Sequence, residues 1–241
     1  LKLLSTAVAN VLAAVLAVRL EVHVLIKMRA VFEKKDRAKY ISHLDLNRCM
    51  QRTFKRSGLP VWYTEGFNPH IYITFALPLS LGYESSVEIM DFNMTEEVSE
   101  KETADKLNKA MPEGLKVLRV YSPQTKHTGI KSAEYMITLS GDSLSLHSEF
   151  EKFMSQEQIN TVKRTKRGGE KIIDLKPDTE VREICEEAGV LKILLRLPAG
   201  NEKNLNPSLI TDLFREYSSV SYELVSVERT GIFSDNGKEF L

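Results

Sequence analysis

The chain is 241 residues long, and 42% of its residues are hydrophobic and 27% are charged. These proportions are typical of a folded globular protein and exclude a disordered or low-complexity chain. Lysine and arginine together number 33, as do aspartate and glutamate, so only the distribution of charge can indicate a partner.

Residues 3–18 carry no charge and lie between Lys2 and Arg19. A helix that spans a membrane needs about 20 apolar residues, and this run is shorter and contains polar side chains. We expect residues 1–27 to be an extension outside the globular fold, either an amphipathic appendage or sequence foreign to the native protein. A signal-peptide core is the less favoured alternative.

The first half of the chain alternates strand and helix patterns. Residues 28–34 predict a strand, and Ser42 is a suitable N-cap for a helix that ends at Gly58 and Pro60. The remaining predictions are strands at 61–64 and 71–75 around a turn at 66–69, a strand at 86–94, an acidic helix at 96–111 capped by Thr95, and a strand at 115–121.

A similar order follows a polar linker at 122–131. We expect a strand at 134–139, a helix at 146–154, a hairpin of 160–166 and 170–175, an extra acidic helix at 178–188, a strand at 190–197, a helix begun by Asn206 and Pro207, and a strand at 221–228. The predicted fold is α+β: two tandem ferredoxin-like (βαββαβ) domains, residues 28–123 and 132–241, with antiparallel sheets and helices on one face.

Cysteine usage adds little to this picture. The two cysteines, Cys49 and Cys185, are too few for a disulfide scaffold or a self-contained metal cluster. Each lies in a helical pattern and is expected as a buried thiol.

Positive charge gathers on the predicted helix after Ser42. Its cations recur at helical spacing and form one stripe: Arg48, Arg52, Lys55 and Arg56. Aromatic residues that could stack on unpaired bases follow directly: Trp62, Tyr63, Phe67 and Tyr72. The stripe predicts contact with RNA; a solvated face over core aromatics, or a protein interface, remains open.

A second basic region is the predicted hairpin, where 161–176 holds six basic residues against two acidic ones. Its candidate RNA-binding residues are Lys163, Arg164, Lys166 and Arg167. A basic hairpin can lie along a phosphate backbone and release counterions. The alternative is a hairpin whose charge only keeps it soluble.

His43 and His70 are candidates for acid–base catalysis because histidine titrates near neutral pH. Ser42, His43, Asp45 and His70 would converge if the start of the helix faced the 66–69 turn. The alternative for His43 is a backbone hydrogen bond at the helix start. The sequence contains no glycine-rich phosphate loop, no HExxH and no CxxC motif, so it predicts neither a metal site nor a bound cofactor.

The motifs SHLDLNR (42–48) and GFNPH (66–70), with the Pro-Leu-x-x-Gly turn after them, resemble a bacterial family, the radical-SAM-linked domain of unknown function. The motif residues are Ser42, His43, Asp45, Gly66, Phe67, Asn68, Pro69 and His70. The resemblance extends to IDLKP at 173–177, and it departs at Ile71 and Tyr72, where Pro and Lys are expected.

The resemblance implies a cytoplasmic protein near RNA or ribosome metabolism, with a radical-SAM enzyme as partner and no membrane association. The chain lacks the three-cysteine cluster motif of radical-SAM enzymes, so radical chemistry would belong to that partner. The tandem order also looks like that of CRISPR RNA-processing endoribonucleases, which is a likeness of architecture alone.

Three functions follow from these observations. The first is a non-catalytic RNA-binding accessory protein. The second is a metal-independent endoribonuclease that uses His43 or His70. The third is a protein-interaction module that docks a radical-SAM enzyme without touching RNA.

Overall fold

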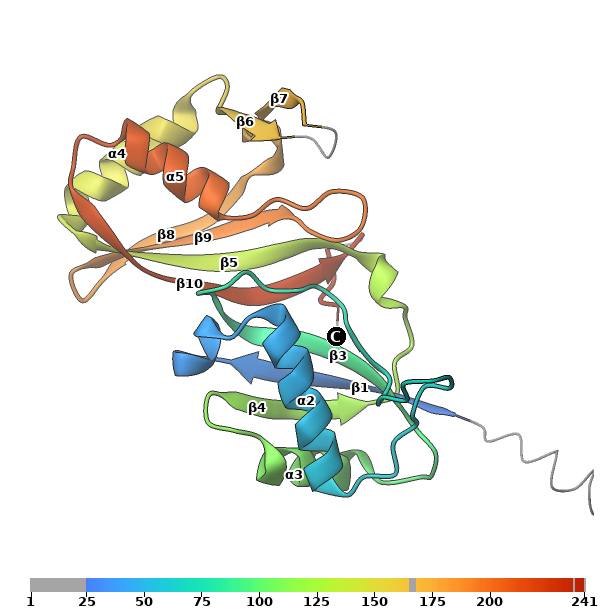
Figure 1. Ribbon diagram of the computed structural model, residues 1–241. Helices are drawn as coiled ribbons and strands as arrows, with labels where there is room; N and C mark the ends of the chain where they lie inside the picture. The colour runs from blue at the N-terminus through green and yellow to red at the C-terminus, as the bar shows by residue number, and fades with distance from the viewer. Residues whose placement is uncertain (1–24, 165–167, 236, 241) are drawn as a thin grey trace, which may run out of the picture.

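The computed structural model describes residues 25–164, 168–235 and 237–240 (Figure 1). The predicted N-terminal extension therefore lies almost entirely outside the described residues. The first half contains a short 3-10 turn, η1 (Asp36–Tyr40), and the elements β1 (Ile26–Lys34), α2 (His43–Ser57), β2 (Ile73–Phe75), β3 (Glu84–Met94), α3 (Glu100–Ala110) and β4 (Leu115–Tyr121).

The second half begins after the 3-10 turn η2 (His127–Gly129). Its elements are β5 (Ile130–Gly141), α4 (Ser143–Ser155), β6 (Asn160–Arg164), β7 (Glu170–Asp174), the turn η3 (Lys176–Asp178), β8 (Glu180–Glu187), β9 (Val190–Pro198), α5 (Ser208–Tyr217) and β10 (Tyr222–Ser234).

One eight-stranded sheet runs through both halves. Its strand order is β4-β1-β3-β10-β5-β9-β8, and β2 pairs with the end of β3. Neighbours are antiparallel except β3 and β10, which pair in parallel through Glu84 and Ser85 with Glu228 and Arg229. The α+β class and the mostly antiparallel pairing are confirmed, but the expectation of a separate sheet for each half was wrong.

Each half covers its part of the sheet with its own pair of helices (Figure 1). In the first core α2 and α3 pack on β1, β3 and β4, with Phe32, Met50, Phe54, Phe92 and Leu107 among its buried side chains. In the second core α4 and α5 pack on β5 and β9 around Phe150 and Phe214. Leu77, Val87 and Ile89 of the first half belong to this second core, so hydrophobic packing also joins the halves.

A buried ionic cluster lies where β3 meets β10. Arg229 and Glu88 are 1% and 2% exposed and form an ion pair, and Arg229 Nη2 also donates to Leu77 O at 2.7 Å. Burial raises the pKa of the neighbouring Tyr135. A buried charge is costly unless it is paired and hydrogen-bonded. The junction of β3 and β10 is therefore stable only when both halves of the chain supply their side of the ion pair.

The Pro-Leu-x-x-Gly turn completes this junction. Tyr83 Oη donates to Asn206 Oδ1 at 2.8 Å, and Asn206 Nδ2 donates to Ser80 Oγ at 2.8 Å. Asn206 Oδ1 also accepts from Ser208 N at 3.0 Å at the start of α5. A motif of the first half thus fastens the first turn of a helix in the second.

The predicted acidic helix at 178–188 was wrong, because this stretch forms η3 and the edge strand β8. Ala188 and Gly189 have φ of 51° and 79° and make a two-residue turn that pairs β8 with β9. A turn of this type usually carries Asn-Gly or Asp-Gly, so Ala-Gly did not identify it. Pairing with β9 and partial burial of Val181 and Ile184 outweigh the helix propensity of the glutamates.

Smaller predictions also changed. The hairpin of β6 and β7 forms its own two-stranded sheet and does not join the main one. Residues 61–64 make only isolated bridges, Val61 to Met94 and Tyr63 to Ile71. The acidic helix begins after Ser99, whose side chain accepts from Glu102 N, and Thr95 does not cap it. Cys49 and Cys185 are half-buried free thiols, and Cys185 lies in β8.

Candidate nucleic-acid interface

Helix α2 presents one apolar and one cationic face. Ser42 Oγ accepts from Asp45 N at 3.1 Å, which caps the helix as predicted, and Gly58 ends it in the left-handed conformation at φ 65°. The buried face consists of Leu46, Met50, Thr53 and Phe54. Because these side chains hold the helix against the sheet, its opposite face is directed to solvent.

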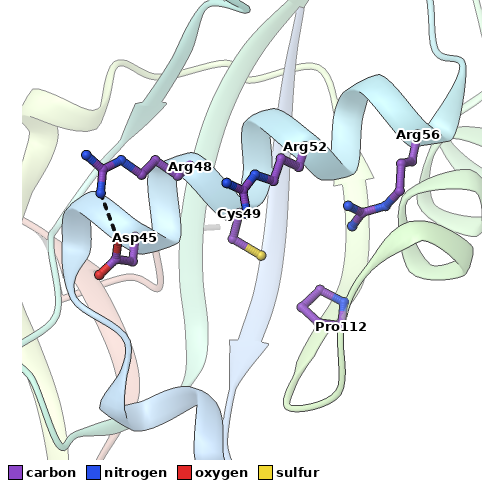
Figure 2. Close-up of a pocket in the computed structure, with 6 residues that line it drawn as sticks. All are labelled: Asp45, Arg48, Cys49, Arg52, Arg56 and Pro112. Carbon is purple, nitrogen blue, oxygen red and sulfur yellow. Dashed lines mark hydrogen bonds and ion pairs between the residues drawn. The ribbon is translucent and has the colours of Figure 1, made fainter.

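Three guanidinium groups of that opposite face line one shallow groove of about 440 Å³. Figure 2 shows Arg48, Arg52 and Arg56 following one another along the helix, with the Cys49 thiol among them and Pro112 at the far end. Asp45 is the remaining lining residue. Lys55 is exposed on the same helix but does not line the groove.

The three arginines differ in how firmly they are held. Arg48 Nη1 lies 3.1 Å from Asp45 Oδ1 in an exposed ion pair, and Arg56 Nη2 donates to Ala110 O at 2.7 Å. Arg52 makes no hydrogen bond or ion pair with any other described residue. The middle guanidinium therefore keeps all its donors for a ligand, and each of its two neighbours is held by one contact.

Among the described residues, Asp45 is the only carboxylate that lines the groove. The hydrogen bond from Ser42 and the one from Arg48 hold the pKa of Asp45 below its usual value, so it is ionised at neutral pH. Three cations against one anion leave the groove positive. Such a surface attracts phosphate, and arginine binds it through two parallel N–H bonds.

Helix α3, whose three acidic residues are balanced by three lysines, does not neutralise these arginines. It meets α2 through its C-terminal end, where Ala110 supplies a carbonyl to Arg56 and Pro112 borders the groove. Its Glu102 pairs instead with Lys106 at 2.8 Å. Within the described part of the chain, no ion pair joins a carboxylate of α3 to the arginines of α2.

The loop that carries the aromatic residues is tied directly to α2. Gln51 Nε2 donates to Ile71 O at 2.7 Å, and Ile71 N donates to Gln51 Oε1 at 3.1 Å. Within the loop, Thr64 N donates to His70 O at 2.8 Å. These bonds hold residues 61–72 beside the helix.

The tip of this loop exposes an aromatic ring. Gly66 has φ of 115°, a conformation that favours glycine, and Phe67 after it is fully exposed. Tyr63 and Tyr72 are also exposed, and Trp62 packs on Tyr72 with ring centroids 5.7 Å apart. Rings held in the open are suited to stacking on unpaired bases.

The two candidate catalytic histidines have separate surroundings. His43 is exposed and packs edge-on to Phe75 at 5.2 Å between ring centroids. His70 Nδ1 lies 3.1 Å from Thr64 Oγ1 and 3.2 Å from Asn68 O. No hydrogen bond joins His70 to Ser42, His43 or Asp45 among the described residues. The convergence of these four residues into one catalytic site stays a prediction.

The basic hairpin is described only in part. Lys163 and Arg164 pair through their backbones with Lys171 and Glu170, but their side chains lie outside the described residues. Lys166 and Arg167 lie outside them altogether. This second part of the predicted RNA-binding surface therefore remains a prediction.

The sequence patterns did not indicate a second hollow, where the buried Arg29 forms a bidentate ion pair with Asp91. The available signal was a pair of opposite charges within two predicted strands.

In the part of the chain that the structure describes, no three His, Cys, Asp or Glu side chains gather as a metal site would require. No helix there is long and apolar enough to cross a membrane.

Comparisons with known proteins identify the family of this chain. No curated protein matches the chain. Among solved structures, it is similar to a chain in the crystal structure of a Cbf5-Nop10-Gar1 complex, with a TM-score of 0.43 and 11% identity over 88% of this chain and 50% of that one. The chain thus spans about half the length of that protein, and these values support no functional inference.

A family model matches residues 27–207, which is most of the chain and contains all the motifs described above. The chain therefore belongs to the family described as "uncharacterized protein conserved in bacteria (DUF2344)".

Proposed function

We propose that this chain is a non-catalytic RNA-binding accessory protein. The observation that carries the proposal is the row of Arg48, Arg52 and Arg56 along one groove, with Arg52 unpaired within the described part of the chain. The groove would take the phosphate backbone, and the loop that Gln51 clamps to the same helix would offer Phe67 to an unpaired base.

We further infer that the two halves are tandem ferredoxin-like units, residues 28–123 and 132–241. Two strand orders support this inference: β4-β1-β3-β2 in the first half and β10-β5-β9-β8 in the second, which are equivalent when each half is numbered separately. On this view the hairpin of β6 and β7 is an insertion that carries the second basic surface.

The resemblance of the SHLD and GFNPH motifs to the radical-SAM-linked family suggests the setting. The protein would work in the cytoplasm beside a radical-SAM enzyme or in RNA processing or ribosome metabolism. It would hold RNA while a partner carries out the chemistry.

The test is binding of labelled single-stranded and structured RNA, measured by fluorescence anisotropy across a range of salt concentrations. Arg52→Glu should weaken binding by about tenfold or more, because a charged hydrogen bond is worth about 1.5–3 kcal/mol. The dependence of log affinity on log salt should become shallower by about 1, since one phosphate contact is lost. Arg167→Glu tests the hairpin in the same way.

Lys152→Glu is the matched control, because Lys152 is exposed on α4 in the other half. It makes the same change of charge without touching the groove, and its binding should equal that of the wild-type protein. If Arg52→Glu and Lys152→Glu behave alike, the groove is not the RNA site. Cleavage of the labelled RNA that is lost in His43→Ala or His70→Ala would show an endoribonuclease instead.

One surface favours a second candidate function, docking of a protein partner. Tyr40, Leu44 and Leu81 are 68%, 59% and 64% exposed, and Gly82 N donates to Lys39 O at 2.9 Å, so the segments that carry Leu81 and Tyr40 are neighbours. Exposed apolar side chains on neighbouring segments are typical of protein interfaces. Leu44→Glu should abolish co-purification of a radical-SAM partner and leave RNA affinity unchanged if the two surfaces act separately.

A further inference from the structure

A second hollow, of about 370 Å³, lies between the start of β1, the C-terminal end of β3 and the segment that follows β4. Figure 1 shows that segment passing beside β1 on its way to β5. The hollow and the α2 groove have no lining residue in common. Its volume is within the range of sites for small molecules, about 300–1,000 Å³.

The floor of the hollow is a rigid, buried ion pair. Arg29 is 1% exposed; its Nε donates to Asp91 Oδ1 at 2.6 Å, and its Nη2 donates to Asp91 Oδ2 at 2.8 Å. Nη2 also donates to Thr125 O at 3.0 Å, and Phe240 lies against the guanidinium at 5.0 Å. Asp91 keeps about a fifth of its side chain exposed, so part of its carboxylate faces the hollow.

The walls supply positive charge and an exposed aromatic ring. Lys27 and Lys126 are exposed at the hollow, and His127 Nδ1 lies 3.8 Å from Asp91 Oδ2. Lys27, Lys126 and Arg29 bring three positive charges to the hollow against the single negative charge of Asp91. The hollow therefore attracts an anion. Tyr72 forms part of the wall, and Trp62 packs against its ring.

A ring platform, exposed cations and a neutralised carboxylate together match the parts of a nucleotide. A base can stack on Tyr72, a phosphate can lie against the lysines, and the Asp91 carboxylate can accept a hydrogen bond from a base or sugar. We propose that this hollow binds a phosphorylated nucleoside, either as a free nucleotide or as the terminal nucleotide of an RNA strand. The proposal does not rest on the α2 groove.

The test is isothermal titration of the full chain with adenosine 5′-monophosphate, adenosine and ribose 5-phosphate. The monophosphate should bind at least tenfold more tightly than either fragment, because only it offers both the ring and the phosphate. Absence of monophosphate binding, or equal binding of a fragment, would overturn the proposal.

Variants at the rim separate binding from folding, because Lys27 and Tyr72 are exposed. Lys27→Glu and Tyr72→Ala should each weaken binding of the monophosphate by at least tenfold. Tyr72→Phe keeps the ring and should bind the monophosphate as tightly as the wild-type protein does. Arg52→Glu should leave this binding unchanged even though it weakens RNA binding at the groove, so the two proposals can fail separately. Equal binding by Lys27→Glu, Tyr72→Ala and the wild-type protein would rule the hollow out.

Competition distinguishes the two sources of the nucleotide. A short RNA with a 5′-phosphate should displace the monophosphate if the site takes an RNA end, and should not displace it if the site takes a free nucleotide. The same RNA with a 5′-hydroxyl should displace nothing in either case. Equal displacement by both RNAs would contradict a site for a phosphorylated nucleoside.

Discussion

Helices α2 and α4 follow the first strand of their respective halves, yet their outer faces differ in charge. The outer face of α2 carries Arg48, Arg52, Lys55 and Arg56, whereas α4 carries Glu149 and Glu151 with a single Lys152. Both helices bury an apolar face against the same continuous sheet. The fold therefore needs only the buried faces, and of these two helices only α2 carries a cationic outer face.

The two helices also hold a neighbouring segment with different chemistry. Gln51 of α2 uses an amide to grip both backbone groups of Ile71. Glu149 of α4 uses a carboxylate, which accepts from Ser218 Oγ at 2.6 Å and from Ser219 N at 2.8 Å. The first of these contacts is independent of pH, and the second titrates.

The largest expected effect lies between the two regions, at the buried pair of Glu88 and Arg229. Glu88→Leu should lower the free energy of unfolding by about 3–5 kcal/mol, because it leaves the buried guanidinium without its counter-charge. Urea denaturation followed by circular dichroism measures the loss. The double variant Glu88→Leu/Arg229→Met should lose less than Glu88→Leu alone; a double variant that is less stable than the single one would show that the pair is not coupled.

A smaller loss is expected at the clamp in the first half. Gln51→Leu leaves the N–H and C=O of Ile71 without their partners, and Ile71 is fully buried. The free energy of unfolding should fall by about 1–3 kcal/mol. Hydrogen exchange should speed up in residues 61–72 before it does in the sheet. Equal exchange in the variant and the wild-type protein would mean that other contacts place the loop.

Removal of the helix cap should cost less again. Ser42→Ala takes away the acceptor for Asp45 N and should destabilise the protein by about 1 kcal/mol, as measured by urea denaturation. Ser42→Thr keeps the acceptor for Asp45 N and the donor to the Asp45 carboxylate, and should recover most of that loss. If the alanine and threonine variants are equally stable, the cap contributes little to α2.

The smallest effect is a pH dependence in the second half. Hydrogen bonds from Ser218 and Ser219 lower the pKa of Glu149 from 4.5 to about 2. Because the pKa is depressed in the folded state, the stabilisation is fully present above pH 4.5 and is lost as the pH falls toward 2. Glu149→Gln should therefore lower the Tm at pH 7, and its difference from the wild-type protein should shrink between pH 4.5 and 2.

Glu157→Gln is the control for that experiment, since it removes the same charge from an exposed position just beyond α4. Its melting curve should follow the wild-type curve at every pH. A Glu149→Gln deficit that persists unchanged at pH 2 would show that the lost hydrogen-bond geometry, and not the charge, is responsible.

Features that depend on neighbours in the chain could be predicted from the sequence. The cap at Ser42, the glycine end at Gly58 and the cationic face of α2 follow from residues within a few turns of one another. The stripe could be placed in advance because helical spacing alone determines which side chains share a face. The Gln51 bonds place the aromatic loop beside the helix, and the expectation that loop and stripe reach the same ligand stays a prediction.

Features that depend on distant partners were decided only by the tertiary structure. The parallel pairing of β3 with β10 joins the two halves of the chain. The ion pair of Glu88 with Arg229 joins residues 141 apart in sequence, and Arg29 and Asp91 are 62 apart. The stretch that became β8 has helix-forming glutamates, and β9 provided the partner that made it a strand. Local propensity is worth tenths of a kcal/mol per residue, so pairing and burial contributed by remote segments can override it.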